Sequence, residues 1–233
     1  MKKVVLNYLV IAVLAISTAL VSSCGGGSGS SGGGKSSGKI KITTEEGGSF
    51  IFYLTGSGVA TVDWGDGSEK VMLTLNESGV RFEHSYPNMS LRTVTINGDN
   101  ITGFNCPGSY DLISLDVSRC TELRTLSCDV MSPNIDVSKN TALTTLIVAG
   151  GLISLDVSKN TALTSLYCGD NKLTSSALND LFRTLHSNTL TNTRGDGWGG
   201  TVEENKNITI SNNPGSADCD RSIAEAKGWE VRN

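Results

Sequence analysis

A nine-residue block that recurs every twenty residues is the feature of this 233-residue chain that most restricts its fold. The block DVSKNTALT occupies residues 136–144 and again residues 156–164, and the looser copy DVSRCTELR occupies residues 116–124. Each copy runs into an extended apolar segment of the form Leu-x-Cys or Leu-x-Val. A single repeat cannot bury these side chains, whereas stacked repeats place them in continuous internal columns. The sequence therefore predicts a stack of similar coils.

The best-preserved copy matches a known repeat pattern. Residues 163–173 read LTSLYCGDNKL, which is LxxLxLxxNxL with cysteine in place of one leucine. Over residues 104–173 the chain resembles the leucine-rich repeats of bacterial surface lipoproteins, which read LDVSxNTxLTxLxC. Its column of cysteines is similar to that of an internalin-type adhesin. The resemblance implies a short leucine-rich-repeat solenoid over residues 99–174 that binds other molecules.

Three cysteines of the repeats are predicted to be packing residues. Cys106, Cys128 and Cys168 occupy the inward position of their extended segments, and Val148 stands in the same position of the repeat between the last two. A position that accepts valine does not require a thiol, so we expect an interior column of reduced cysteines. The five cysteines after Cys24 are odd in number and lack CxxC spacing, so no metal or redox site is predicted.

Polar residues of the repeats are expected to support the turns. Asn140 and Asn160 should bond the backbone of the turns that they occupy, with Cys120 in the equivalent place. Charged columns should line the surface, formed by Asp116, Asp136, Asp156, Arg119, Lys139 and Lys159. Stacked aspartates also occur in calcium-binding rolls, but the glycine-rich nonapeptide of those proteins is absent. We therefore expect these carboxylates to accept bonds from local N–H groups.

Residues 39–98 have a different periodicity, with apolar residues at every second position. Six such runs, separated by turn sequences such as TGSG and WGDGS, predict a small antiparallel sandwich. DWGDG at 63–67, with a later HSY, resembles the immunoglobulin-type sandwich of PKD-like domains, which implies a spacer or adhesion module. Asp63, Asp66 and His84 could form a metal or acid–base cluster. Aspartate beside glycine is ordinary turn chemistry, so the turn interpretation is preferred.

Residues 175–233 are predicted to cap the repeats. A helix with Ser175 or Ser176 as its N-cap should bury apolar residues with i, i+3, i+4, i+7 spacing, namely Leu178, Leu181, Phe182 and Leu185. A second short helix is expected over residues 218–227, ended by Gly228. The chain as a whole is thus predicted to be mainly β, with a sandwich, a solenoid and a helical cap.

The first 38 residues are predicted to export and anchor the chain. Two lysines, an apolar run and VSSC at 21–24 resemble a bacterial lipoprotein signal, in which residues 1–23 are removed and Cys24 is lipidated. A plain transmembrane anchor is the alternative. Residues 24–38 are rich in glycine and serine and predict a flexible tether. They also contain GSSGGGKS, but no strand precedes this match to a nucleotide-binding loop and no helix follows it.

The charge of the chain restricts its partners. There are 19 basic and 23 acidic residues, and the leader contains no acidic one. An acidic mature chain argues against nucleic acid, so contact with a membrane is expected through the lipid on Cys24. Gly25 follows Cys24 in place of the aspartate that favours inner-membrane retention. This predicts an outer-membrane lipoprotein of a Gram-negative envelope, facing either the periplasm or the exterior.

No nucleophile and base are visible together, since the two histidines, His84 and His186, fall in separate domains. We therefore predict a monomeric protein without a cofactor that binds a protein or glycan and is not an enzyme. Its binding residues should be the outward positions of the extended segments, which are Thr125, Ser127, Thr145, Ile147, Ser165, Tyr167 and Thr209.

Two of these positions, Ile147 and Tyr167, are expected to be neighbouring exposed apolar residues, as in a protein-recognition patch. The alternative is a carbohydrate-binding accessory protein that uses Tyr167 and Trp198. Trp198 lies in a glycine-rich loop with an RGD tripeptide at 194–196. We interpret this tripeptide as a chance occurrence.

Overall fold

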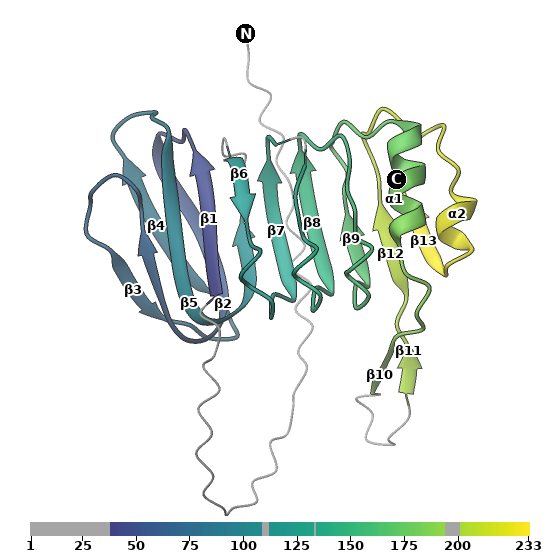
Figure 1. The fold of residues 1–233 in the computed structure, drawn as a ribbon, viewed down its shortest axis with the longest axis horizontal. Helices are drawn as coiled ribbons and strands as arrows, with labels where there is room; N and C mark the ends of the chain where they lie inside the picture. Colours follow the sequence, from purple (N-terminus) through teal and green to yellow (C-terminus); the bar gives the residue numbers. More distant parts are fainter. Residues whose placement is uncertain (1–37, 109–111, 133, 194–200) are drawn as a thin grey trace, which may run out of the picture. The chain divides into compact units, whose positions relative to one another are not determined.

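The computed structural model describes residues 38–108, 112–132, 134–193 and 201–233. Within these residues the chain is mainly β, as predicted, and one mixed sheet contains eleven strands. Figure 1 shows the antiparallel strands towards one end of this sheet and the parallel strands towards the other. No helix in the described part of the chain is long and apolar enough to cross a membrane.

Five strands form most of the antiparallel part: β1 (Gly38–Thr44), β2 (Gly48–Asp63), β3 (Val71–Thr74), β4 (Val80–Tyr86) and β5 (Arg92–Cys106). Their inward residues form an aromatic core in which Phe52 stacks on Phe82, with ring centroids 5.3 Å apart. The ring of Trp64 also packs against Phe52, with centroids 5.6 Å apart. Alternation of apolar and polar residues thus gives each strand one buried side.

The structure has one strand fewer here than the six predicted. The TGSG segment lies within β2 and does not reverse the chain; it interrupts the pairing with β5, whose register shifts on both sides of it. Gly56 adopts a positive φ of 147°, and a Cβ there would lie 2.0 Å from the carbonyl oxygen of Asn100. Glycine at this position permits a bulge and a close backbone approach instead of a turn.

One strand joins the antiparallel and parallel parts of the sheet. The first half of β5 pairs antiparallel with β1, and its last four residues pair in parallel with β7 (Thr125–Val130). β6 (Leu112–Asp116) pairs with β1. The boundary predicted between residues 98 and 99 therefore falls inside a continuous strand.

The repeats supply successive strands of the parallel part. After β7, the order is β8 (Thr145–Gly150), β9 (Ser165–Tyr167), β12 (Lys206–Thr209) and β13 (Trp229–Arg232), all paired without a register shift. One buried column contains Leu126, Leu146, Leu166 and Ile208, and a second contains Cys106, Cys128, Val148, Cys168 and Ile210. The predicted inward register and the interior position of the three cysteines are confirmed.

Side-chain amides link consecutive repeats. Nδ2 of Asn160 donates to the carbonyl oxygens of Val137 at 3.0 Å and Asn140 at 2.8 Å, and Asn140 donates in the same way to Val117 and Cys120. The bonds therefore reach the turn of the preceding repeat, whereas the sequence predicted bonds to the asparagine's own turn. Cys120 occupies the first position of this series.

The C-terminal segment adds α1 (Ser175–Thr184), which lies beside the last strands in Figure 1. The predicted apolar side chains of this helix are buried. Its N-cap is Thr174, whose hydroxyl accepts a bond of 3.2 Å from the N–H of Ala177, and not the serines predicted. Thr174 takes this role because its backbone is extended, as an N-cap requires.

The remaining elements are short. α2 spans only Ser222–Glu225, because hydrogen-bonded turns occupy the start of the predicted range 218–227. Gly228 follows with a φ of 77°, as expected of a helix terminator. β10 (Thr191–Thr193) and β11 (Thr201–Glu203) form a separate two-stranded sheet.

Candidate binding face on the parallel strands

The outward side chains of the parallel strands form two straight rows, which we call the strand face. The first row contains Thr125, Thr145, Ser165 and Asn207, and the second contains Asn105, Ser127, Ile147, Tyr167 and Thr209. Neighbouring strands lie about 4.8 Å apart, so side chains within a row are within reach of one another. The seven residues predicted on the repeat strands are thus brought together. Trp198, Cys24 and the RGD tripeptide lie outside the described residues.

Two members of the strand face were not predicted. Asn105 of β5 pairs with Ser127, and Asn207 of β12 pairs with Ser165, whose hydroxyl lies 3.4 Å from the asparagine Oδ1. Each asparagine is next to an inward apolar residue, so period-two reasoning could have placed both. The irregular spacing of the first and last repeats obscured them.

The two apolar members of the face differ in their surroundings. Ile147 is 37% exposed. Tyr167 is half-buried, and its hydroxyl donates a bond of 2.9 Å to Oδ2 of Asp170. Its ring lies close to Gly169, where a Cβ would approach Tyr167 Cζ to 3.0 Å. Tyr167 is therefore partly structural, and the prediction that it is exposed in the same way as Ile147 is wrong.

A third row continues the face beyond these residues. Asp129 is the next outward residue after Ser127 on β7, and it pairs with Ala149 of β8. Burial raises the pKa of the Asp129 carboxyl, and the nearby carboxylate of Asp170 raises it further. Among the described residues, no hydrogen bond or ion pair engages Asp129. Small residues, Ala149 and Gly150, separate this acid from the strand that carries Tyr167.

A left-handed backbone position recurs at the end of successive strands. Gly150 has a φ of 114°, Asp170 of 56° and Asn212 of 57°. The N–H of Gly150 donates to the carbonyl of Asp170, and Nδ2 of Asn212 donates to Asp170 Oδ1 at 2.9 Å. Glycine, aspartate and asparagine tolerate this conformation best. The geometry fixes the Asp170 carboxylate beside the strand face.

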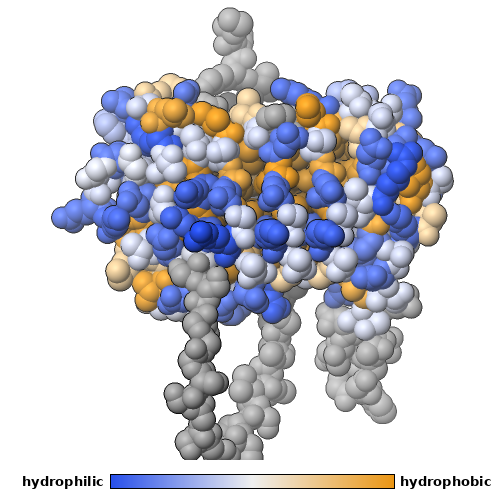
Figure 2. Space-filling model, viewed as in Figure 1, coloured by the Kyte–Doolittle hydropathy of each residue, from blue (hydrophilic) through white to orange (hydrophobic). Residues whose placement is uncertain are grey.

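The aspartates of the repeat blocks cap local turns, as predicted. Oδ1 of Asp116, Asp136 and Asp156 accepts a bond of 2.8–3.0 Å from the N–H of the serine two residues later. Bonds from Ser118 and Ser138 lower the pKa of Asp116 and Asp136. Figure 2 shows hydrophilic side chains in regular rows across the repeats, with apolar ones between them. Among the described residues, no three potential metal ligands cluster.

The predicted turn at DWGDG also has local bonding. Asp66 Oδ1 accepts bonds from the hydroxyl and N–H of Ser68, and its Oδ2 lies 2.7 Å from Nε2 of His84. The His84 ring stacks on Trp64, with centroids 4.9 Å apart. The hydroxyl of Tyr86 donates to the carbonyl oxygen of Trp64 at 2.9 Å. This supports the turn interpretation over a catalytic or metal cluster.

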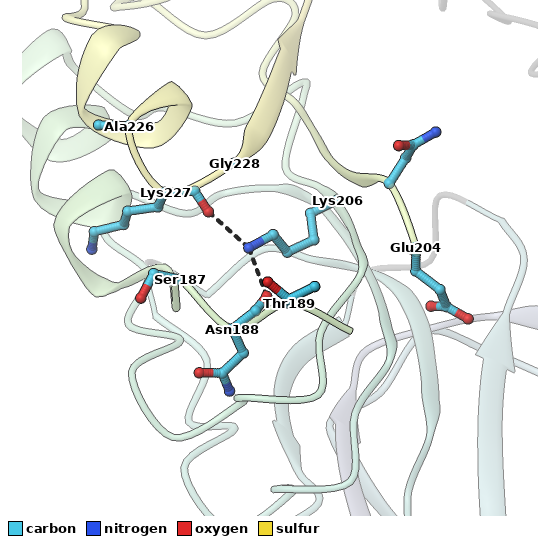
Figure 3. A pocket seen from close by; sticks show the side chains of 9 residues that line it. Ser187, Asn188, Thr189, Glu204, Lys206, Ala226, Lys227 and Gly228 are labelled. Atoms are coloured by element: carbon cyan, nitrogen blue, oxygen red, sulfur yellow. Dashed lines mark hydrogen bonds between the residues drawn. The ribbon is translucent and has the colours of Figure 1, made fainter. Parts of the chain in front are cut away.

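A hollow of about 340 Å³ surrounds Lys206 at the C-terminal end (Figure 3). The Lys206 ammonium donates to the carbonyl oxygens of Asn188 at 2.9 Å and Lys227 at 2.7 Å, so it ties two segments together. Burial lowers the pKa of Lys206. Because the ammonium group already donates to these backbone carbonyls, it is less available to a ligand. The hollow is therefore a weaker candidate for a binding site than the strand face.

The strand face therefore combines the predicted outward side chains with an exposed apolar residue, Ile147. It also borders Asp129, which has no hydrogen-bond or ion-pair partner among the described residues. Comparisons with protein-family models, with curated proteins and with solved structures find no match to this chain.

Proposed function

We propose that the chain is a non-enzymatic lipoprotein of a Gram-negative envelope whose repeats form a leucine-rich-repeat solenoid that binds a protein partner. The observation that carries the proposal is the strand face, where Ile147 is exposed beside Tyr167 in a row of polar side chains. Recognition patches combine an apolar anchor with a polar surround in this manner.

The solenoid assignment is supported by several regularities. The strands of successive repeats pair in parallel at twenty-residue spacing, and asparagine amides bond from repeat to repeat. A PKD-like sandwich before it is supported by the DWGDG turn, in which Gly65 and Gly67 both adopt positive φ. We assign this part the role of a spacer.

The anchor is assigned from the sequence at Cys24, with residues 24–38 as a tether to the outer membrane. Replacing this cysteine removes the thiol that would be lipidated, so Cys24→Ala should move the protein from the membrane fraction to the soluble fraction. A Cys219→Ala variant should remain with the membrane. Membrane association of Cys24→Ala would contradict the lipoprotein assignment.

Binding through the strand face is tested with two isoleucine variants. Ile147→Ser changes the face, and Ile153→Ser makes the same change at another exposed isoleucine that lies outside these rows. Immobilised wild type and Ile153→Ser should retain the same envelope protein, which Ile147→Ser should lose by about tenfold or more. Equal retention by both variants would place the binding site elsewhere.

The carbohydrate alternative predicts a different result. A glycan-binding protein should retain an oligosaccharide on a glycan array and no protein from the extract. Replacement of Tyr167 or Trp198 should then reduce the array signal, because aromatic rings stack on sugars.

A further inference from the structure

A short segment, residues 186–188, connects the last repeat to the C-terminal strands. Nδ2 of Asn188 donates a bond of 3.2 Å to a carbonyl in the turn before β9. The carbonyl oxygen of Asn188 accepts a bond from the ammonium of Lys206, at the start of β12. The carbonyl oxygen of His186 accepts a bond of 2.9 Å from Nε1 of Trp229, at the start of β13. We call this segment the cap strap, because it ties both strands to the repeat.

The hydrogen bonds of the cap strap fix the protonation state of His186. Its Nε2 lies 2.7 Å from the carbonyl oxygen of Leu163, which can only accept, so Nε2 carries a proton and donates it. Its Nδ1 accepts a bond of 3.2 Å from the N–H of Asn188 and is therefore unprotonated. The ring is thus neutral with both nitrogens in use. A second proton can enter only at Nδ1, where it breaks the bond to Asn188.

The charges around His186 also oppose a second proton. The ammonium groups of Lys206 and Lys227 act on the ring, and both repel a positive charge there. Glu204 borders the hollow beside Lys206, but its side chain points away from that ammonium in Figure 3. Charged residues on α1 and β13 pair within their own elements. Burial and the two lysines hold the pKa of His186 below its ordinary value, and the bond to the repeat offsets this only in part.

From this arrangement we propose that His186 is a proton-sensitive latch, whose protonation in acid opens the cap strap and loosens β12 and β13 from the repeats. A proton taken from solvent occupies the Nδ1 lone pair, so the N–H of Asn188 loses its acceptor, and the new charge repels both lysines. The latch is independent of what the strand face binds.

The pH range of the latch follows from the two states of the ring. In the opened strap the imidazole is hydrated and has its ordinary pKa of about 6.5. In the closed strap the pKa of His186 is lower, so the opened form binds the proton more tightly. Opening therefore becomes more favourable as the pH falls below about 6.5, by up to about tenfold per pH unit, until the pKa of the closed form is reached.

Hydrogen exchange of the full-length protein measures this opening. The protection factors of the β12 and β13 amides, corrected for intrinsic exchange, should fall by about three- to tenfold between pH 7.5 and pH 5.5. Those of the β7 and β8 amides should change by less than about twofold, because these strands lie away from the cap strap. An equal change in both pairs of strands would contradict a local latch.

His186→Asn is the matched variant. An asparagine Oδ1 can accept from the N–H two residues later, as Asp116 does from Ser118, but it does not titrate in this range. Its β12 and β13 protection factors should vary by less than about twofold over the same pH interval. The control His84→Asn removes the other histidine and should keep the wild-type response. The same pH response in wild type and His186→Asn would overturn the proposal.

A titration of the wild type tests the latch without the His186 variant. The imidazole signals of His186 in NMR spectra, identified by comparison with His84→Asn, should titrate with a pKa below 6.5, as the lowered pKa requires. A midpoint at or above 6.5 would also overturn the proposal, since protonation would then not favour the opened strap.

Discussion

The side-chain amide of Asn160 donates a hydrogen bond of 2.8 Å to the main-chain carbonyl of Asn140, its equivalent in the preceding repeat. Both asparagines are buried, and Asn140 makes the corresponding bond to Cys120. The carbonyl of Asn140 also accepts a bond of 3.1 Å from the N–H of Leu143, so the amide supplies a second donor to it. The constant spacing of twenty residues therefore repeats one hydrogen-bond pattern along the stack.

Removal of one amide should break two hydrogen bonds. In Asn160→Ala the carbonyls of Val137 and Asn140 lose the side-chain donor, but each keeps a backbone donor, the N–H groups of Asn140 and Leu143. We expect the free energy of unfolding to fall by about 1–3 kcal/mol in urea denaturation, the net contribution of two hydrogen bonds. The control Asn205→Ala, at an exposed asparagine, should change it by less than about 0.5 kcal/mol. Equal effects would show that the buried amide does not stabilise the stack.

Neighbouring residues on β8 should differ sharply in their contribution to stability. Leu146 is fully buried and Ile147 is 37% exposed. Leu146→Ala should lower the free energy of unfolding by about 2–5 kcal/mol, because it leaves a cavity in a packed column. Ile147→Ser should lower it by no more than about 1 kcal/mol. Urea denaturation checks both values, and the reverse order would mean that the assigned inward register is wrong.

The hydrogen bond of Tyr167 is open to a narrower test. Tyr167→Phe keeps the ring near Gly169 and removes the hydroxyl that donates to Asp170. We expect a loss of about 0.5–1.5 kcal/mol in the free energy of unfolding, which is typical of one net hydrogen bond. A change below about 0.2 kcal/mol in urea denaturation would indicate that the bond contributes nothing to the folded state.

The inward and outward register of the repeats was predictable because it follows from short-range periodicity. Leu126, Leu146 and Leu166 are spaced by twenty residues, and alternation within each strand then assigns the intervening side chains. The same reasoning placed the three interior cysteines. No long-range information was needed for these assignments.

Other features depend on contacts that periodicity does not encode. The sequence TGSG is compatible with either a turn or a bulge. The bulge forms because the backbone of Gly56 packs closely against the carbonyl of Asn100, a contact that periodicity does not predict. The continuity of β5 depends on two different partners, β1 and β7. At the candidate site, the proximity of Asp129 to Asp170 was missed because these residues are 41 positions apart in the sequence and are brought near one another only by strand pairing.

The DWGDG turn should make stability depend on pH. Bonds from Ser68 and the neighbouring His84 hold the pKa of Asp66 well below its ordinary value. A carboxyl with a lowered folded-state pKa stabilises the protein above the unfolded pKa, near 3.9, and loses this contribution as the pH falls below it. We expect Tm to fall less between about pH 5 and pH 3 in Asp66→Asn than in the wild type. Identical pH profiles by calorimetry would contradict this assignment.

The interior thiols should destabilise the fold at alkaline pH. Burial raises the pKa of Cys168 to about 12, and it raises the pKa of Cys128 well above the ordinary value of 9.0. Below pH 9 these thiols are neutral in both states. Above it the unfolded chain releases protons that the folded chain retains, so each thiol should reduce the free energy of unfolding by about 1.4 kcal/mol per pH unit.

Valine at Val148, in the same column, provides the matched substitution for this test. Cys128→Val/Cys168→Val should stay within about 1.5 kcal/mol of the wild type at pH 7, since the volume change is small. Between about pH 9 and pH 11 the wild type should lose stability faster than this variant, whereas Cys219→Ala, at a partly exposed thiol, should differ less from the wild type. Urea denaturation with a reductant measures the difference. Parallel pH profiles of wild type and double variant would mean that the two thiols ionise as readily in the folded protein as in the unfolded chain.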